Sequence, residues 1–511
     1  MEKVMSLPKE VYQALLKVVG PENIADRPHI LAALRHTNPQ SGRQPPSPAA
    51  VIMPGSVEEV REIVRICNRH GVRYNAVVSM FGMGGVVSQP GMLVISLRRM
   101  NRIIEINEFD RYAVIEPAVR QVQLKAEVFK RGLTYPTASA GPSCSVLANF
   151  LTSGDHHTQQ SSSRCSRYLL GYEWVTPTGE IVRVGSLAHG AGWFCPDGPG
   201  PSLRGLVRGY GGWGGGLGIV TRIAIGLDDW KGPRVLTTQG HSPDYKIPFP
   251  PDCHRVFIFK FPTLEKVRDA MTEMGKAEIG QAVLKFFYAT EAVLFTVSAN
   301  DFRDLWNSGL YQRELPRALW VYLAAWTPEE LAYEERVMRD IVEEFGGEPV
   351  DASITRKYEE NMDFFILVSF LQRVLKLGGG WSPTKLGADS IHHMFEVAAA
   401  IPEFFYDFIE KGRILDAPHN FQVIPMEYGH AAHIELLFFF DNQRPDWQQI
   451  PAEVMQKSME SDIRHGFHAA TPPRVKAVME RLGPLYSNFQ VWTNKIKETF
   501  DPNNVSNPGP G

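Results

Sequence analysis

Apolar and polar residues recur along the first half of the chain in a helical rhythm and in a strand rhythm. The clearest helical stretch has apolar positions three and four residues apart, at Val57, Val60, Ile63, Val64 and Cys67. Ser56 lies three residues before Glu59, which is a capping-box spacing, and Gly71 follows the last apolar position. We therefore expect a helix that begins after Ser56 and ends at Gly71.

Short apolar runs around this helix predict a sheet-rich first part. β-Branched and apolar residues gather at 72–78, 93–97, 112–116 and 217–227, and Gly132 ends a helical pattern over 122–130. The run GYEWVTPTGEIVRVG is typical of a hairpin that turns at Thr178-Gly179. A short helical pattern and a polar Pro/Gly segment precede all of this, in residues 1–45.

The pattern changes after residues 228–252, which are rich in turn residues and predict a domain boundary. Strands are expected at 255–261, 293–298, 320–326 and 434–441. Helices are expected at Leu264–Met274 and Pro328–Glu344, the second ended by Gly346-Gly347, and in a terminal region, 451–500. Strands that alternate with helices in this way predict an α+β domain with an open sheet.

Composition narrows the class of protein. At 511 residues the chain exceeds the size at which single cores stop growing, so two or more domains are expected. A net charge of -3 provides no basic field for nucleic acid or anionic membranes. The N-terminus lacks the apolar core of a signal peptide, and no apolar run is long enough to span a bilayer. The five cysteines are scattered and form no C-x-x-C pair, which argues against a disulfide framework or an iron–sulfur cluster and favours a reducing cytoplasm.

Glycine-rich loops are the most unusual feature of the first part. VVSMFGMGGVVSQ follows a predicted strand, but its third fingerprint glycine is absent. A formal G-x-G-x-x-G at 209–214 leads into a strand instead of a helix, which argues against a dinucleotide-binding domain of the Rossmann type. Read together, the loops 79–85, 139–154 and 211–218 could surround a pyrophosphate with backbone N–H groups, or they could be tight turns in a sheet.

The order of several motifs decides between these interpretations. PGSVEEV, the glycine loop, VIEPAV, GYEWVTPTGEIVRVG, GLGIVTRIAI and the tail DPNNVSNPG together resemble the vanillyl-alcohol oxidase/p-cresol methylhydroxylase superfamily of FAD enzymes. ANFLTSGD, GPGPSLRGLVRGYGG and the long segment from Gly466 to Asn504 are most similar to its 4-alkylphenol-oxidising branch. The likeness runs from about Pro46 to the C-terminus.

The resemblance implies an α+β fold with a two-part PCMH-type FAD-binding domain and a substrate cap. Residues 1–45 would be a helical extension, 46–228 the FAD domain, 235–450 the cap with an open antiparallel sheet, and 451–511 a segment that returns to the FAD domain. The first loop would then hold the FAD pyrophosphate. The implied cofactor-binding residues are Ser79, Met80, Phe81, Gly82, Met83, Gly84, Gly85, Pro142, Ser143, Ser145, Asn149, Ser153, Gly218, Ile219 and Val220.

The sequence departs from the family pattern at several places. The first loop has no histidine for a covalent flavin bond, and Cys144 is displaced by one residue from where doubly tethered members carry a cysteine. A tether from His392, His393 or His430 stays open, and we expect non-covalent FAD. The alkylphenol branch has an aspartate where this chain has Thr152, and a Tyr-Arg pair where it has Ala470 and Thr471.

Other residues would then supply the chemistry. Flavin chemistry needs a base within reach of the substrate proton. His430, His433 and Glu435 lie in MEYGHAAHIELLFFFD, at a strand edge that faces the flavin in this superfamily, and His433 and Glu435 point the same way if the strand begins by His433. The further catalytic candidates are His468, beside the lost anchor, Tyr428 and Arg373. We assign no metal site, although H-x-x-H loosely resembles a metal-binding element of the glycolate/D-lactate dehydrogenase branch.

We therefore expect a cytoplasmic FAD-dependent oxidoreductase that takes hydride from an alcohol, 2-hydroxy acid or benzylic carbon. One alternative is a 4-alkylphenol or aryl-alcohol oxidase with a rebuilt anchor. Another is the flavoprotein subunit of an electron-transfer complex, which would pass electrons to an iron–sulfur or flavoprotein partner. A redox-neutral flavoenzyme of the alkyl-dihydroxyacetone-phosphate synthase kind is a third. Homo-oligomers are compatible with all of these.

Overall fold

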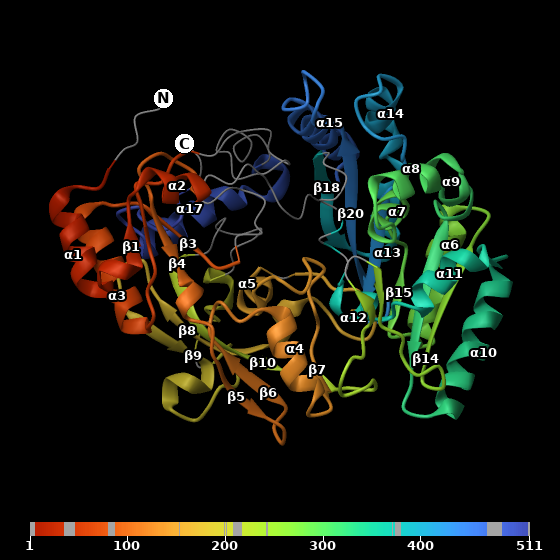
Figure 1. Ribbon diagram of the computed structural model, residues 1–511, viewed down its shortest axis with the longest axis horizontal. Helices are drawn as coiled ribbons and strands as arrows, with labels where there is room; N and C mark the ends of the chain where they lie inside the picture. Colours follow the sequence, from red (N-terminus) through yellow and green to blue (C-terminus); the bar gives the residue numbers. More distant parts are fainter. Residues whose placement is uncertain are drawn as a thin grey trace.

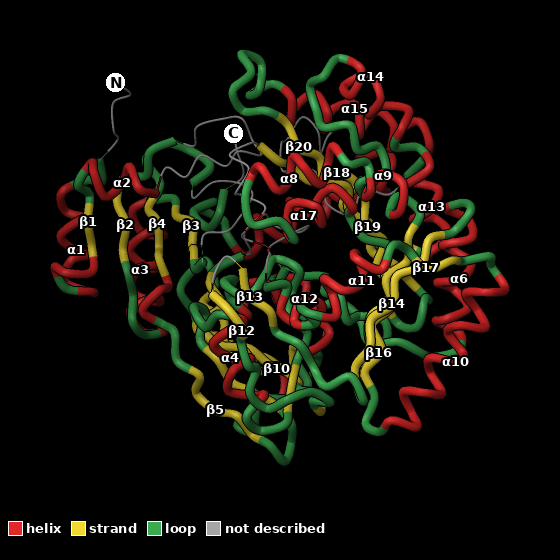
Figure 2. Tube along the Cα trace, turned by 45° about the vertical axis from the view of Figure 1, so that its right-hand side comes forward, coloured by secondary structure: helices red, strands yellow, loops and turns green. Residues whose placement is uncertain are grey.

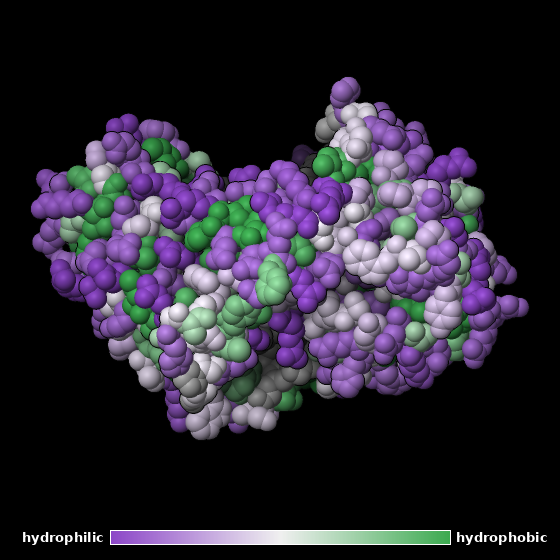
Figure 3. Space-filling model, turned by 90° about the horizontal axis from the view of Figure 1, so that it is seen from below, coloured by the Kyte–Doolittle hydropathy of each residue, from purple (hydrophilic) through white to green (hydrophobic). Residues whose placement is uncertain are grey.

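The computed structural model describes residues 6–34, 46–79, 87–152, 154–198, 200, 202–207, 217–241, 244–369, 371, 373, 380–467 and 483–508. The chain forms two bodies that lie side by side (Figure 1). The first half of the sequence builds one body, and residues from about 239 to 467 build the other, which we call the cap region. Seen from below, the outline is notched between the two bodies (Figure 3).

The first body begins with a mixed sheet in the order β1-β2-β4-β3. Its strands are β1 (Ile24–Ala25), β2 (Ala50–Ile52), β3 (Tyr74–Val77) and β4 (Leu93–Ser96). The predicted helix is α3 (Val57–His70). Ser56 Oγ accepts from Glu59 N at 3.2 Å, and Gly71 ends the helix with φ 64°. Val11, Leu15 and Val19 of α1 (Lys9–Val19) share the core of this sheet and α3. A second helix, α2 (Pro28–Leu34), lies nearby in the chain.

A five-stranded antiparallel sheet in the order β5-β6-β10-β8-β9 forms the rest of the first body. Its strands are β5 (Ile103–Asn107), β6 (Tyr112–Ile115), β8 (Leu169–Val175), β9 (Ile181–Val184) and β10 (Ile219–Gly226). The predicted hairpin is β8–β9, and Gly179 takes φ 90° in its turn. The helices α4 (Gln121–Phe129) and α5 (Val146–Leu151) pack residues into the core of this sheet, and β7 (Leu133–Thr134) pairs with β11 (Asp228–Asp229).

The cap region contains two antiparallel sheets that are joined. One has the order β15-β16-β14-β17 and the other β18-β20-β19. A bridge between Lys285 and Val423 connects the end of β15 to β19. The strands are β14 (His254–Lys260), β15 (Ala282–Leu284), β16 (Ala318–Ala324), β17 (Glu348–Pro349), β18 (Gly380–Asp389), β19 (Phe421–Met426) and β20 (Ala431–Phe440), with a small hairpin of β12 (Gln239–His241) and β13 (Asp244–Lys246). The open antiparallel sheet expected from the sequence is confirmed.

Helices cover both faces of this joined sheet. On one face α6 (Leu264–Lys276), α10 (Pro328–Glu344), α13 (Ile391–Ala399) and α14 (Pro402–Glu410) share one apolar core, and Figure 2 shows α6 and α10 outside β14 and β16. The other face buries α7 (Tyr288–Leu294), α11 (Ala352–Glu359) and α12 (Asp363–Leu367), and α8 (Ala299–Asn307) and α9 (Leu310–Glu314) lie beside them. The strand expected at 293–298 is wrong. Its first residues are the end of the buried helix α7. A short apolar run is compatible with either a buried strand or a buried helix, so the pattern alone could not distinguish them.

A carboxyl group is buried inside this second core. Glu291 of α7 is fully buried, and burial raises its pKa to about 8, while interactions with Tyr358, Lys357 and Lys285 act in the opposite direction. Lys285 is equally buried, which lowers its pKa well below the ordinary value, and its Nζ donates to the backbone oxygens of Phe286, His419 and Phe421 at 3.0, 2.7 and 2.8 Å. Burial therefore favours the neutral, protonated form of Glu291.

The C-terminal segment divides between the two bodies. Within α15 (Ile450–His465), Asp462 forms an ion pair with Lys385 of β18, so this helix belongs to the cap region. After it, α17 (Phe489–Phe500) places Phe500 5.8 Å from the ring of Trp174 in the first body. Residues 505–507 then exchange backbone hydrogen bonds with Tyr74 of β3. None of the helices in the described ranges has both the length and the apolar character needed to cross a bilayer.

Candidate active site

Two of the loops expected to hold the cofactor lie side by side. Ser145 N donates to Ser79 Oγ at 3.4 Å, which joins the end of β3 to the loop before α5. Ser79 and Ser143 are exposed and Pro142 is half-buried, so this surface is accessible, whereas Ser145 is buried and caps α5 by accepting from Ala148 N at 3.1 Å. The side chain of Asn149 donates to Ser145 O at 2.8 Å. Met80 to Gly85 and Ser153 lie outside the described residues.

Asp155 connects this loop surface to the cap region. Ser139 N donates to the backbone oxygen of Asp155 at 2.9 Å, so residue 155 lies directly beside the loop 139–145. Its side chain is 20% exposed and reaches toward His433 of β20, with Oδ1 3.9 Å from His433 Nε2. Asp155 therefore places the loop 139–145 next to the cap sheet.

His433 and Glu435 lie on the same face of that sheet, as the sequence predicted. Strand β20 begins at Ala431, and its register places His433 opposite Ile424 and Glu435 opposite Gln422 of β19. Gln422 Nε2 donates to Glu435 at 3.0 Å. Neighbours on this face, such as Ile424 and Leu437, belong to the core on the α7 side, while the alternate residues face α13 and α14.

Arg164 completes a cluster of charged side chains around His433. Its guanidinium donates to His433 Nδ1 at 3.0 Å. The opposite ring nitrogen, Nε2, is buried and has no hydrogen-bond partner, and neither has Asp155 Oδ2. His433 Nε2 lies 3.9 Å from the other oxygen of the same carboxyl group, Oδ1, so a hydroxyl or carbonyl oxygen of a ligand could satisfy these unpartnered atoms.

The two carboxyl groups of this cluster differ in proton affinity. Burial acts to raise the pKa of Asp155, but His433, a hydrogen bond from Ser139, Arg164 and His157 together hold it below its usual value. Burial raises the pKa of Glu435, and the negative charge of Asp155 adds to the effect, although His433 and Gln422 counteract it. The surroundings therefore favour the ionised form of Asp155 and shift Glu435 toward its protonated form.

The loop after Asp155 is held to the cap region by backbone contacts. Glu427 N and Tyr428 N, in the β19–β20 turn, donate to Ser162 O and Gln160 O, both at 2.7 Å. Gln159 Nε2 donates to Ile424 O at 3.1 Å. His157 packs between Phe286 and Phe364, with ring centroids 5.3 and 5.1 Å away. These contacts fix Asp155 and Arg164 against His433.

The structure separates the other predicted catalytic residues from this cluster. His430 is exposed in the β19–β20 turn. The side chain of Tyr428 is also exposed, and its backbone oxygen packs against Gly275 of α6, where an added Cβ would lie only 2.3 Å away. Arg373 donates to Leu294 O at 2.9 Å and stacks on Tyr245, deeper in the cap region. His468, Ala470 and Thr471 lie outside the described residues.

The remaining cofactor and tether residues are placed as follows. Gly218 has φ 75°, and an added Cβ would lie 2.3 Å from Val175 O, so strand packing accounts for this glycine. Ile219 and Val220 are buried in the cores of the first body. Burial raises the pKa of Cys144 to about 12, which keeps it a thiol that donates to Ala140 O. His392 and His393 lie on α13, behind the sheet that carries His433, and therefore cannot reach this site.

The residues around the loop surface fit a polar cofactor. Gln121, beside Cys144, is fully buried with both amide atoms unpaired, and Gln160 and His157 Nδ1 are likewise buried without partners. Such atoms are rare in folded proteins unless a ligand or water satisfies them. The described residues contain no group of three or more His, Cys, Asp and Glu side chains arranged to hold a metal ion.

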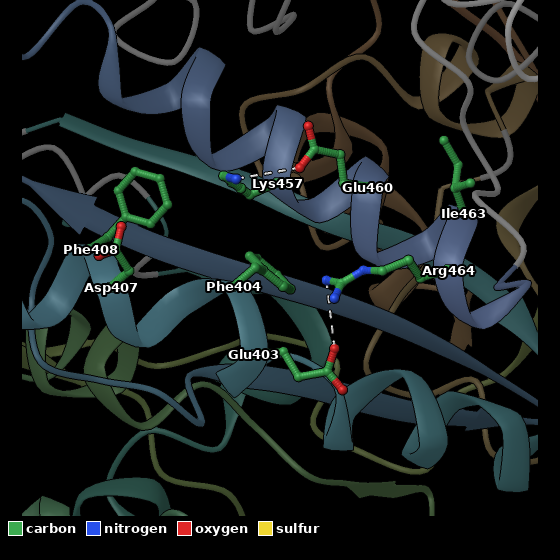
Figure 4. A pocket seen from close by; sticks show the side chains of 8 residues that line it. All are labelled: Glu403, Phe404, Asp407, Phe408, Lys457, Glu460, Ile463 and Arg464. Atoms are coloured by element: carbon green, nitrogen blue, oxygen red, sulfur yellow. Dashed lines mark hydrogen bonds and ion pairs between the residues drawn. The ribbon is translucent and has the colours of Figure 1, made fainter.

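A separate groove of ≈ 620 Å³ opens between α14 and α15 (Figure 4). Phe404 and Phe408 form part of its lining, and charged pairs such as Glu403–Arg464 and Lys457–Glu460 lie around them. It lies on the α13–α14 side of the cap sheet, which is the opposite side from His433. The groove is therefore distinct from the cluster around Asp155.

Comparison with known proteins assigns the first body. Residues 48–185 match the family model of the FAD binding domain. The structure of p-cresol methylhydroxylase with substrate bound superposes with a TM-score of 0.77 at 16% identity, covering 98% of this chain and 97% of that one. That of 4-ethylphenol oxidase from Gulosibacter chungangensis gives 0.74 at 18%, with the same coverage. Residues 48–185 are thus an FAD binding domain, and the chain as a whole has the fold of p-cresol methylhydroxylase.

Relatives in sequence agree with this family. An uncharacterized FAD-linked oxidoreductase of Mycobacterium tuberculosis is 23% identical over 96% of this chain and 97% of its own length. A D-lactate dehydrogenase of Anaerostipes hadrus is 23% identical over 90% and 89%. The glycolate oxidase subunit of Bacillus subtilis is 29% identical over 43% and 45%. The protein is thus an FAD-dependent oxidoreductase, and the loops 79–85 and 139–154 lie within the part of the sequence that matches the FAD binding domain.

Sequence reasoning missed Asp155 and Arg164. The family pattern places an aspartate where this chain has Thr152. In the structure the acidic side chain comes from Asp155, three residues later. The signal was present in SGDHHTQQSSSR, a loop with one acidic and one basic residue among small polar ones. Only the fold shows that both lie beside His433, which is 269 residues after Arg164 in the chain.

Proposed function

We propose that this enzyme oxidises a carbon that carries a hydroxyl group, as in an alcohol or a 2-hydroxy acid, with Asp155 as the base. The supporting observation is the pair of carboxyl groups on either side of His433, one with a lowered pKa and one with a raised pKa. Environments that shift the pKa values of two neighbouring carboxyl groups in opposite directions are typical of catalytic acid–base pairs.

The chain's own residues would position and deprotonate the substrate. Bound FAD supplies the hydride acceptor, flavin N5. Asp155 Oδ2, which is unpartnered, takes the hydroxyl proton, and His433 and Glu435 bind the oxygen from the cap side. Phe286 and Phe364, beside His157, exclude water from the interface.

We propose that residues 46–228, joined by α17 and the tail 501–508, form the FAD domain and that the cap extends from 235 to 467. The divided packing of the C-terminal segment supports this boundary, which falls later than residue 450. The cofactor would contact Ser79, the segment 80–85, Pro142, Ser143 and Asn149 and would be bound non-covalently, since Cys144 is a buried thiol.

The substrate class can be tested with a panel of candidate substrates that would reduce the flavin. Under anaerobic conditions, D-lactate, glycolate and D-2-hydroxyglutarate are compared with 4-cresol and 4-ethylphenol, and loss of the oxidised-flavin absorbance is followed. Reduction by a hydroxy acid or alcohol, lost in Asp155→Asn, is the expected result. If dithionite reduces the flavin but none of the compounds in the panel does, the proposal is refuted.

The aromatic rings at the interface favour one alternative, a 4-alkylphenol or aryl-alcohol oxidase. Phe286, Phe364 and His157 form an apolar, ring-lined wall next to Asp155. Reduction by the phenols alone in the same panel would favour this second function.

The proposal includes the cytoplasm as the compartment and a protein as electron acceptor. All five cysteines are unpaired, which is usual where thiols stay reduced. The B. subtilis relative is named as a subunit of an oxidase, and its likeness supports a protein partner. Fast reoxidation of the reduced flavin by molecular oxygen would argue against such a partner.

A further inference from the structure

The contact between Arg164 and His433 determines which ring nitrogen of the histidine carries the proton. A guanidinium has N–H donors and no acceptor, and it stays charged in proteins. Its bond to His433 Nδ1 at 3.0 Å therefore requires an unprotonated Nδ1 with a free lone pair. The neutral imidazole then carries its proton on Nε2, the nitrogen that faces Asp155 at 3.9 Å.

Few polar side chains surround His433, and Arg164 is the partner of its Nδ1. The side chain is 4% exposed, so water has little access to it. The groups that face it are Arg164 and Asp155 from the first body and Glu435 and Gln422 from the cap sheet, and Gln422 already donates to Glu435. His433 Nε2 and Asp155 Oδ2 are left as a donor and an acceptor without partners.

We propose that Arg164 is a positioning residue, which holds His433 in the tautomer protonated on Nε2 so that the imidazole acts as a hydrogen-bond donor to the substrate oxygen and not as the base. This inference rests on the proposed function. It assigns separate tasks to the cluster: Nε2–H holds the oxygen, and Asp155 receives the proton.

With these roles the reaction balances in atoms and electrons. The substrate O–H bond breaks and its proton moves to Asp155, while the hydrogen on the same carbon leaves with its electron pair as hydride to the bound FAD. The carbon–oxygen bond becomes a carbonyl, the substrate is oxidised by two electrons and the cofactor is reduced by two. The oxygen keeps its hydrogen bond from His433 Nε2–H throughout, and the chain returns to its starting state when Asp155 loses the proton.

The first test reads the tautomer directly and needs no substrate. Holoenzyme labelled with ¹⁵N in its histidine rings gives separate NMR signals for protonated and unprotonated nitrogens, and the signals of His433 are those lost in His433→Asn. We expect an unprotonated Nδ1 and a protonated Nε2 in the wild type and in Arg164→Lys, which keeps a donor. Arg164→Met should yield a mixture of tautomers. A protonated Nδ1 in the wild type, or no change in Arg164→Met, would overturn the proposal.

Arg167→Met is the matched control, because Arg167 lies at the same interface but is 68% exposed and only approaches Glu427, at 3.8 Å. It should leave the His433 signals unchanged. Flavin absorbance and melting temperature verify that each variant folds and retains its cofactor. If Arg164→Met does not fold, the wild-type and Arg164→Lys spectra still decide the tautomer.

A second test separates the two ring positions by chemistry. The amide of Gln can replace an Nε2–H donor, whereas that of Asn can replace only the acceptor at Nδ1. With a reductant from the panel above, His433→Gln should retain at least about 10-fold more of the flavin reduction rate than His433→Asn. Equal or reversed rates would contradict the donor role. A panel in which no compound reduces the flavin would refute the proposed function, while the NMR result would still decide the tautomer.

Discussion

The buried carboxyl of Glu291 makes the stability of the cap region depend on pH in an unusual direction. In the folded chain burial raises its pKa to about 8, against an ordinary value of 4.5. Between these two values the folded protein holds one proton more than the unfolded chain, so folding becomes less favourable as the pH rises. Glu291→Gln replaces the carboxyl by a neutral group of the same shape and should remove this dependence.

The size of the effect follows from the pKa difference. Each pH unit within that window lowers the free energy of unfolding by about 1.4 kcal/mol. From about pH 6 to about pH 8, wild-type protein should therefore lose roughly 2–3 kcal/mol relative to Glu291→Gln. Above the folded pKa the difference stays constant, because both states are ionised. A domain of this size changes its melting temperature by roughly 2–4 °C per kcal/mol.

Melting temperatures of both proteins, measured by calorimetry at a series of pH values, test this reasoning. Glu359→Gln is the matched control, since Glu359 is exposed on α11 next to Tyr358, and it should follow the wild type. If Glu291→Gln and wild type lose stability in parallel from pH 6 to pH 8, Glu291 is ionised in the folded cap, and the account of its burial is wrong.

Three further predictions concern the site and its support. Asp155→Asn should retain FAD but reduce it about 10²–10⁴-fold more slowly in stopped-flow experiments, and an unchanged rate would eliminate Asp155 as base. In the pH–rate profile the acidic limb should belong to Asp155, whose pKa is lowered, and the alkaline limb to Glu435, whose pKa is raised, so Glu435→Gln should abolish only the alkaline limb. Gly275→Ala forces a Cβ to 2.3 Å from Tyr428 O and should destabilise the cap by about 1–3 kcal/mol in urea unfolding, whereas Gly205→Ala, with open space around it, should not.

Local signals in the sequence predicted the elements of the first body well. The α3 helix has its cap at Ser56 and its end at Gly71, and the β8–β9 hairpin turns where Thr178-Gly179 indicated. The cap region was harder. Strand β18, GWSPTKLGAD, contains Pro, Lys and two Gly and has no alternating pattern, and it is a strand because β20 pairs with it. The apolar run at 293–298 lies in a buried helix and its exit, where periodicity does not distinguish the two states.

The sequence predicted the relative placement of site residues only where they lie on the same strand. His433 and Glu435 share a strand, so their common face follows from the two-residue period. Asp155 and Arg164 come from a loop of the other body, and no local rule relates that loop to β20. His430 and Tyr428 were reasonable candidates by type, but the turn after β19 directs them to solvent while its backbone holds the loop.

The C-terminal tail has a consequence for biosynthesis. Tyr74 of β3, the last strand of the first sheet, exchanges backbone hydrogen bonds with Val505 and Asn507, and Gly218 N donates to Ser506 Oγ at 2.9 Å. Val505 lies 431 residues after Tyr74, a stretch that a ribosome needs about 20–90 s to make at about 5–20 residues per second. Until then the nascent first sheet has an open edge, the kind of surface that pairs with other chains. Chaperones that shield such edges during translation should therefore limit the yield of this flavoprotein more than the stability of its finished fold does.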